Sequence, residues 1–184
     1  ALTLAEALNA RNRLAEDVGN LAAVYLAQGR LHQALAYLER QEQLARDTGN
    51  AHELSRAQGN RATVQLCLGQ YEAALKNLES SLAMFAAQKR KGAVIASLIE
   101  LSWCYQGLGQ RQKAKIKAEE AYALACEKGE DVLRMFALRR LTVAGAREGQ
   151  SPLLEALAIA RVHERHLDVA ATLLLLAERE QVQA

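Results

Sequence analysis

One heptapeptide recurs along this chain: it reads GRLHQAL at residues 29–35, GQYEAAL at 69–75, GQRQKAK at 109–115 and GQSPLLE at 149–155. The glycines that open these stretches stand 40 residues apart. A fixed period of about 20–50 residues is the sequence signature of a solenoid, in which like units stack on their neighbours. We therefore expect about four stacked units followed by a capping helix.

Each recurring glycine is expected to end one helix just before the next begins. The residue that follows a helix commonly adopts a positive φ angle, which costs glycine nothing and costs other residues about 1–2 kcal/mol. Two helices joined by so short a turn are antiparallel neighbours, and small side chains let them pack closely. Such residues are Ala22, Ala62, Ser102 and Thr142 seven places before each glycine, and Ala34, Ala74 and Ala114, but Leu154, five places after it.

The apolar residues between the turns follow a helical period. The second repeat has one such stripe, formed by Tyr71, Ala74, Leu75, Leu78, Leu82 and Phe85. These spacings place all six on one side of a helix, and no strand would produce them. The sequence therefore predicts an all-α fold.

The hinge residues resemble those of the tetratricopeptide repeat. The shared features are a small residue, a tyrosine at 25 and 105, the glycine, and an alanine five residues later. The usual repeat has about 34 residues, and a repeat of 40 is similar to the long-helix variant of kinesin light chain, spindle-orientation adaptors, and bacterial regulators and signalling ATPases. Gly19–Tyr25 (GNLAAVY) is a close match, and the resemblance covers residues 11–164.

The resemblance implies a right-handed superhelical solenoid of antiparallel helix pairs. HEAT repeats have a similar period, of about 40–47 residues, and are the alternative, but they lack the fixed glycine-plus-alanine hinge. We predict a single domain over 1–184, with repeats at about 11–50, 51–90, 91–130 and 131–164 and a C-terminal helix at about 166–182.

Local signals predict where the helices begin and end. Residues 1–10 are expected to be the remnant of an earlier repeat or a capping turn, with Thr3 and Glu6 as a capping box. Because the chain starts at Ala1 rather than at methionine, we expect a fragment of a longer protein. Asn50 is expected to cap a helix together with Glu53.

The fourth repeat carries its own boundary signals. Its first helix is expected at about 131–148, before the hinge at Gly149. Ser151 followed by Pro152 predicts a capped helix start. The final helix carries four consecutive leucines from Leu173, so we expect one of its faces to be left for a partner, including a second copy of the chain.

Composition excludes several classes of function. The net charge of +2 gives no global basic field that would attract nucleic acid. No apolar run approaches the ~20 residues that span a bilayer, so no membrane association is expected. The odd number of cysteines, without C-x-x-C spacing, predicts buried thiols in a reducing, cytoplasmic compartment. They are Cys67, Cys104 and Cys126.

The resemblance implies that the first helix of each repeat lines a concave groove. Nine residues before each hinge glycine stands the position of the family's ligand-facing asparagine, which is here Asn20, Asn60, Glu100 and Arg140. An asparagine offers both a donor and an acceptor to the backbone of an extended peptide. Trp103 and Arg139 are neighbouring groove positions, and tryptophan and arginine are frequent interface anchors.

Each of these residues also has a purely structural interpretation. Asn20 and Asn60 each follow a glycine and could accommodate a helical bend. Trp103 could fill the core, and Glu100 and Arg140 could belong to a solvated helix face.

The repeat pattern itself is broken at two positions. Arg61 stands where a leucine is expected, and Gly145 where a tyrosine is expected.

No constellation predicts catalysis, a cofactor or a nucleotide site. His163 and His166 are spaced as two metal ligands could be, but no third ligand follows them in the expected pattern. The basic run over 111–117 precedes two glutamates, which indicates a solvated face, and aromatic residues for base stacking are missing.

We therefore expect a non-catalytic scaffold that binds a protein or peptide segment, with no direct nucleic-acid contact. The alternative is a sensor or oligomerisation module of a larger bacterial regulator or signalling ATPase.

Overall fold

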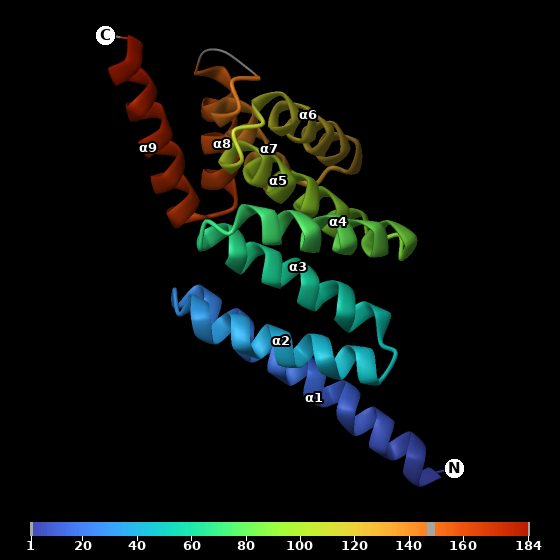
Figure 1. The fold of residues 1–184 in the computed structure, drawn as a ribbon. Coiled ribbons are helices and arrows are strands. Elements are labelled where there is room, and N and C mark those ends of the chain that lie inside the picture. The colour runs from blue at the N-terminus through green and yellow to red at the C-terminus, as the bar shows by residue number, and fades with distance from the viewer. Residues whose placement is uncertain (1, 147–149, 184) are drawn as a thin grey trace. The chain divides into compact units, whose positions relative to one another are not determined.

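A computed structural model describes residues 2–146 and 150–183. Within these ranges the ordered elements are helices, and none is a strand. They are α1 (Leu2–Ala27), α2 (Leu31–Asp47), α3 (Ala51–Cys67), α4 (Tyr71–Ala87), α5 (Lys91–Gly107), α6 (Arg111–Lys128), α7 (Asp131–Val143), α8 (Ser151–Val162) and α9 (His166–Gln183). Figure 1 shows the helices as successive hairpins. The predicted all-helical fold is confirmed.

The chain forms two compact units, the N-terminal unit Ala1–Lys91 and the C-terminal unit Gly92–Ala184. In the N-terminal unit α1 packs on α2, α2 on α3, and α3 on α4. In the C-terminal unit α6 packs on α7, α7 on α8, and α8 on α9. Helices that are consecutive in the chain are thus neighbours in space, as in a helical solenoid. The division falls at the predicted junction of the second and third repeats, and the single domain stays a prediction.

Three of the four hinge glycines have the predicted conformation. Gly29, Gly69 and Gly109 have φ angles of 70°, 71° and 72°. At each hinge the glycine N–H donates to the carbonyl three residues before it, as from Gly69 to Leu66 at 3.1 Å, and the next N–H donates to the carbonyl five residues before it. This Schellman arrangement pairs the carbonyls at the helix end. The fourth hinge, Gly149, lies outside the described residues.

The fourth hairpin does not keep the predicted boundaries. Helix α7 ends at Val143 rather than near residue 148, because Gly145 adopts a φ angle of 67°. The N–H of Ala146 donates to the carbonyl of Leu141 at 2.9 Å, so the same Schellman turn closes this helix four residues early. A glycine stands here in place of the tyrosine of the first and third repeats.

The start of α8 is also different from the prediction. The residue before the helix is Gln150, whose side chain makes no capping hydrogen bond, and Ser151 is already helical, so the predicted Ser151 cap is wrong. Pro152 occupies the first turn as predicted. Leu154 is 51% exposed, and the close contact of the hairpin is made instead by Ala156, which is buried against α7.

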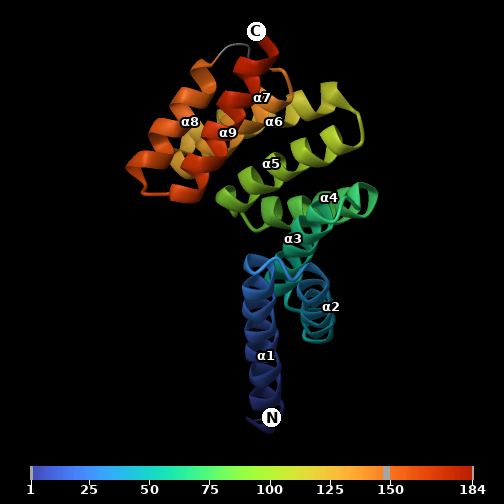
Figure 2. The ribbon, with the colours of Figure 1, turned by 90° about the vertical axis from the view of Figure 1, so that its left-hand side faces the viewer.

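The first helix is longer than predicted. Helix α1 runs without a break from Leu2 to Ala27, so residues 2–10 are not the end of a separate helix and Thr3 does not cap one. That stretch contains neither glycine nor proline, so nothing in it stops a helix. Figure 2 shows α1 extending past the end of α2. Leu4, in the extension, is 77% exposed.

Asn50 caps α3 as predicted. Its Oδ1 accepts a hydrogen bond from the N–H of Glu53 at 3.1 Å. The Glu53 side chain does not complete the capping box. It accepts instead from Gln41 Nε2 on α2 at 2.8 Å and pairs with Arg56 at 2.9 Å. The capping residues therefore also connect α2 to α3.

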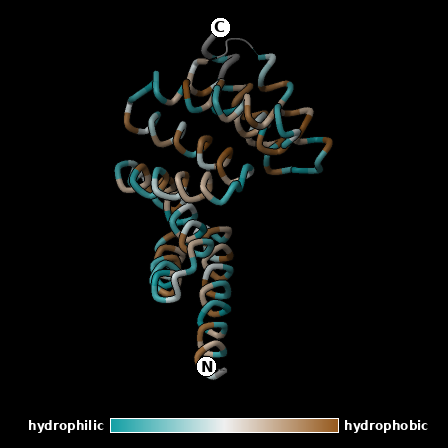
Figure 3. Tube along the Cα trace, turned by 90° about the vertical axis from the view of Figure 1, so that its right-hand side faces the viewer, coloured by the Kyte–Doolittle hydropathy of each residue, from teal (hydrophilic) through white to brown (hydrophobic). Residues whose placement is uncertain are grey.

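The cores consist mainly of alanine and medium-sized aliphatic residues. One cluster in the N-terminal unit comprises Ala22, Ala34, Leu38 and Val64, and one in the C-terminal unit comprises Met135, Leu138, Ala156, Ile159 and Ala160. Figure 3 shows hydrophobic and hydrophilic residues alternating along the helices, as expected when each helix buries one side.

The prediction of three buried thiols is wrong for two of them. Cys104 is buried, whereas Cys67 and Cys126 are exposed. Both exposed cysteines follow buried residues near the ends of α3 and α6, Leu66 and Ala125, and therefore point to a different side of the helix.

Candidate functional site

In the N-terminal unit the first helices of the two repeats, α1 and α3, lie side by side. Arg56 Nη2 donates to the carbonyl oxygen of Glu16 at 3.2 Å. Near one end of the contact, Asn50 Nδ2 donates to Asn12 Oδ1 at 3.1 Å. At its centre Gly19 leaves so little room that a Cβ there would lie 2.7 Å from Arg56 Nη2. The residues on this contact are 38 or 40 positions apart, which is the repeat period within two residues.

Asn20 and Asn60 stand one helical turn beyond Glu16 and Arg56, on the same sides of α1 and α3. Asn20 is exposed and Asn60 is half-buried. Within the described part of the chain, neither side chain hydrogen-bonds to another residue. Both amides are therefore without a partner among the described residues, and their role in binding stays a prediction.

In the C-terminal unit the structure brings Trp103 and Arg140 together. The Arg140 guanidinium carbon lies 5.4 Å from the centre of the Trp103 ring, which joins α5 to α7 by a cation–π contact. One turn further along, Gln106 Nε2 donates to the Val143 carbonyl at 3.4 Å. Both members of the pair are half-buried, as is Glu100 one turn before Trp103.

Burial lowers the pKa of Arg140, and the charge of neighbouring Arg139 lowers it further. A guanidinium nevertheless remains protonated in a protein. Arg140 is therefore a partly desolvated cation held on an aromatic ring, and such cations are frequent anchors for a partner.

Arg139 points in a different direction from Arg140. Its Nη1 pairs with Asp168 Oδ1 on α9 at 3.1 Å, and its side chain is only 16% exposed. Successive residues of a helix point about 100° apart, which explains why these two arginines reach different helices. The role of Arg139 in binding stays a prediction, and its observed ion pair is to the last helix.

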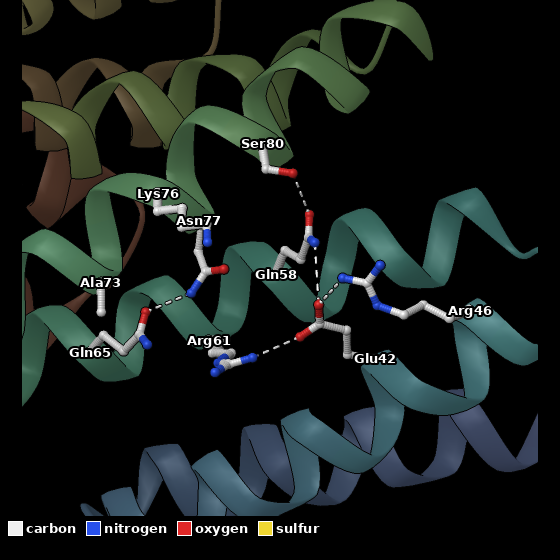
Figure 4. Close-up of a pocket in the computed structure, with 9 residues that line it drawn as sticks. All are labelled: Glu42, Arg46, Gln58, Arg61, Gln65, Ala73, Lys76, Asn77 and Ser80. Atoms are coloured by element: carbon white, nitrogen blue, oxygen red, sulfur yellow. Dashed lines mark hydrogen bonds and ion pairs between the residues drawn. The ribbon is translucent and has the colours of Figure 1, made fainter.

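A polar cavity that we did not predict lies between α2, α3 and α4. Its volume is about 450 Å³. Figure 4 shows the nine side chains that line it, which are Glu42, Arg46, Gln58, Arg61, Gln65, Ala73, Lys76, Asn77 and Ser80.

Glu42 is the centre of the network in this cavity. Its Oε1 pairs with Arg46 Nη2 at 2.6 Å and accepts from Gln58 Nε2 at 3.3 Å, and its Oε2 pairs with Arg61 Nη1 at 2.9 Å. Burial alone would raise the pKa of Glu42, but the hydrogen bonds from these three residues outweigh it and leave the pKa below the ordinary value. Glu42 is therefore a buried carboxylate that stays ionised.

The cavity lies on a different side of α3 from Asn60. Gln58, Arg61 and Gln65 are spaced as neighbours on one helix face. At about 100° per residue, Asn60 lies roughly 130° around the helix axis from their centre. The candidate groove residues and the cavity are therefore separate surfaces of the N-terminal unit.

One sequence signal could have revealed the cavity. The positions equivalent to Gln58, Arg61 and Gln65 are mostly apolar in the other repeats. Gln58 is replaced by Val18, Leu98 and Leu138, and Arg61 by Leu21, Leu101 and Leu141. Gln65 is replaced by a tyrosine in two repeats. Three polar residues at apolar repeat positions, spaced for one helix face, indicate a local polar site. Of these three residues, only Arg61 was recognised from the sequence as a departure from the repeat pattern.

Among the described residues, no group of three or more histidine, cysteine, aspartate or glutamate side chains could hold a metal ion. His163 instead faces Asp131, with Nε2 and Oδ2 3.8 Å apart. No helix in the described part of the chain is long and apolar enough to cross a membrane.

Comparison with known families supports the repeat architecture. The family model described as tetratricopeptide repeat matches residues 14–87, which include the second helix pair and most of the first. The resemblance inferred from the hinge residues is thereby confirmed, and consecutive helix pairs pack as in a tetratricopeptide-like solenoid. No curated protein sequence matches the chain.

Solved structures share the fold. The chain is similar to the nearly identical tetratricopeptide-like repeats of a putative kinesin light chain from Podospora anserina, with 27% identity, a TM-score of 0.60, and coverage of 80% of this chain and 76% of that one. A point variant of those repeats gives 26% identity, a TM-score of 0.63, and coverage of 82% and 76%.

The chain also resembles aspartyl phosphate phosphatase F from Bacillus subtilis, with a TM-score of 0.69 over 88% of its length. At 15% identity this likeness concerns the fold alone, and the chain spans 44% of the length of that protein.

Proposed function

We propose that the chain is a non-catalytic scaffold that binds a protein or peptide segment along the first helices of its repeats. Tetratricopeptide repeats generally mediate protein–protein interaction. The observation that carries the proposal is the half-buried Trp103–Arg140 pair on α5 and α7, an aromatic ring and a desolvated cation presented together. The open amides of Asn20 and Asn60 on α1 and α3 support it.

The proposal is tested with peptides selected from a random library by binding to the wild-type chain. Trp103 is the only tryptophan, so its fluorescence reports contact directly. We expect a saturable change in Trp103 emission, and binding at least tenfold weaker for Asn60→Ala combined with Trp103→Ala when measured with a labelled peptide. Asn9→Ala is the matched control, because it removes an exposed asparagine from α1 outside the candidate site. Equal affinity of the double variant and the wild type would contradict the proposal.

A second candidate function is self-association through α9, the property expected of an oligomerisation module. Leu176 is buried on this helix, whereas Leu167, Leu173 and Leu174 are 88%, 44% and 65% exposed. A second copy of the chain would remove these leucines from water. Sedimentation at several concentrations should show an oligomer that Leu174→Glu dissociates, and a monomer at every concentration would contradict this candidate.

The cytoplasmic location is likewise a proposal. Cys67, Cys104 and Cys126 form no disulfide within the described residues, which supports a reducing compartment.

A further inference from the structure

The cavity between α2, α3 and α4 has more positive than negative charge. Arg46, Arg61 and Lys76 line it with Glu42 as the one acidic residue of the lining. Glu39, just outside the lining, lies 3.6 Å from Arg61, so the group carries one positive charge in excess. Arg46 and Arg61 are both paired with Glu42. Lys76 makes no ion pair or hydrogen bond within the described residues. Lys76 is an exposed residue of the lining, and an ammonium group there without a counterion favours an anionic ligand.

Gln65 supplies a second unused donor. The residue is only 4% exposed, and its Oε1 accepts from Asn77 Nδ2 at 2.8 Å. Its Nε2 has no hydrogen-bond partner among the described residues, and this nitrogen is not fully enclosed by protein atoms. Figure 4 shows Gln65 and Asn77 bonded through one end of the glutamine amide, which leaves the nitrogen end unused. Because solvent reaches this nitrogen, a ligand can take the place of the water that accepts from it.

The rest of the network holds these donors in place. Ser80 Oγ donates to Gln58 Oε1 at 2.9 Å, and Gln58 in turn donates to Glu42. The carboxylate oxygens of Glu42 are therefore occupied by donors from α2 and α3. A cation entering the cavity would find its one carboxylate already paired.

From these observations we infer that the cavity binds a carboxylate group, with Lys76 as the charged contact and Gln65 Nε2 as the hydrogen-bond donor. The two oxygens of a carboxylate match one ammonium and one amide donor. A phosphate would bring up to two negative charges next to buried Glu42, and is disfavoured for that reason. The site is separate from the groove residues and does not depend on the proposed function.

The test follows the side-chain amides of Gln65 and Asn77 by two-dimensional NMR of the ¹⁵N-labelled full chain, with the Gln65 signals assigned from their loss in Gln65→Glu. The titrants, at constant ionic strength, are glutarate, the blocked peptide acetyl-Ala-Glu-Glu-Ala-amide, its neutral Gln-Gln counterpart, and inorganic phosphate. We expect a saturable shift with glutarate or the acidic peptide and none with the neutral peptide. Binding of the acidic peptide identifies a protein side chain as the source, and binding of glutarate alone identifies a small metabolite.

Variants separate a specific site from general attraction of anions. Lys76→Gln should weaken binding about tenfold, whereas Lys115→Gln, on α6, should change it less than twofold. Gln65→Glu, followed through the Asn77 amide, should abolish binding, because its own carboxylate would repel the ligand. Asn60→Ala should leave binding unchanged, so the outcome is independent of the groove. No saturable shift with any carboxylate, binding of phosphate alone, or equal effects of Lys76→Gln and Lys115→Gln would overturn the inference.

Discussion

Replacing Arg61 by leucine should destabilise the N-terminal unit, even though leucine is the residue that the other repeats carry at this position. Arg61 Nη1 pairs with Glu42 Oε2 at 2.9 Å, and the two side chains are 29% and 10% exposed. Removing one partner of a fully buried pair costs about 3–5 kcal/mol, and removing one of an exposed pair costs ~0–1 kcal/mol. Arg61 is partly solvated, and Arg46 remains on Glu42, so we expect a loss of about 1–2 kcal/mol.

The double variant Glu42→Leu with Arg61→Leu should recover this loss. The position of Glu42 is Leu82 in the next repeat, and a well-packed apolar pair is often as stable as a buried ion pair. We expect the double variant to lie within about 1 kcal/mol of the wild type. Glu39→Ala is the control, because Glu39 is 55% exposed and 3.6 Å from Arg61, and its removal should cost less than about 0.5 kcal/mol.

The loss should also depend on pH. The pKa of Glu42 in the folded chain is held below its ordinary value of 4.5, partly by Arg61. Its contribution to stability is therefore fully present above the unfolded-state pKa and is lost as the pH falls through the folded-state pKa. The stability difference between wild type and Arg61→Leu should be constant near neutral pH and decrease below about pH 4.5.

Urea unfolding measures these differences. Trp103 fluorescence follows the C-terminal unit, while circular dichroism follows both units, so a change seen only by circular dichroism places the effect in the N-terminal unit. If Arg61→Leu alone is as stable as the wild type, the ion pair is not required and the reasoning is refuted.

Three further predictions concern the backbone and the thiols. Gly19→Ala should destabilise the chain by about 1–3 kcal/mol, because the new Cβ would overlap the buried side chain of Gln41. The matched variant Gly59→Ala has room for its Cβ and should stabilise the chain by ~0.5–1 kcal/mol. Equal effects of the two variants on thermal unfolding would contradict this prediction. Lys89 has a φ angle of 56°, so Lys89→Gly should relieve strain and raise stability by about 1 kcal/mol, and a lowered unfolding temperature would count against it. A thiol reagent should label two cysteines rapidly and Cys104 only after unfolding; a single rapid phase for all three would be inconsistent with the observed burial.

Most of the fold could be predicted from the sequence because its constraints are local and repeat. A glycine every 40 residues, with apolar stripes at helical spacing between, defines hairpins without knowledge of distant contacts. The errors fall where two local signals compete. Gly145 and Gly149 can both end a helix by their sequence, and the structure uses Gly145. The first ten residues carry no stop signal at all, so assigning them to a separate helix followed the repeat register instead of the local sequence.

The candidate site could be predicted only in part. The repeat alignment identified Asn20, Asn60, Trp103 and Arg140 as candidate groove residues, and their role in binding stays a prediction. The contact between Trp103 and Arg140 is a finding of the structure. The alignment could not show that Arg139 turns to Asp168, because that contact depends on how the last helix docks. The cavity was missed because its donors come from three helices, and their meeting depends on how neighbouring hairpins pack.

The polar cluster around Glu42 has a consequence for how the repeats assemble. Hairpins of similar sequence can dock in the wrong order, since most of their apolar surfaces are interchangeable. If α5 of the third repeat packed against α2 in place of α3, Leu98 and Leu101 would face Glu42 where Gln58 and Arg61 now stand. The ionised carboxylate of Glu42 would then be buried in an apolar contact without these two partners. The polar cluster therefore favours the correct order of the repeats, because docking the equivalent helix of another repeat against α2 would cost the free energy of an unpaired buried charge.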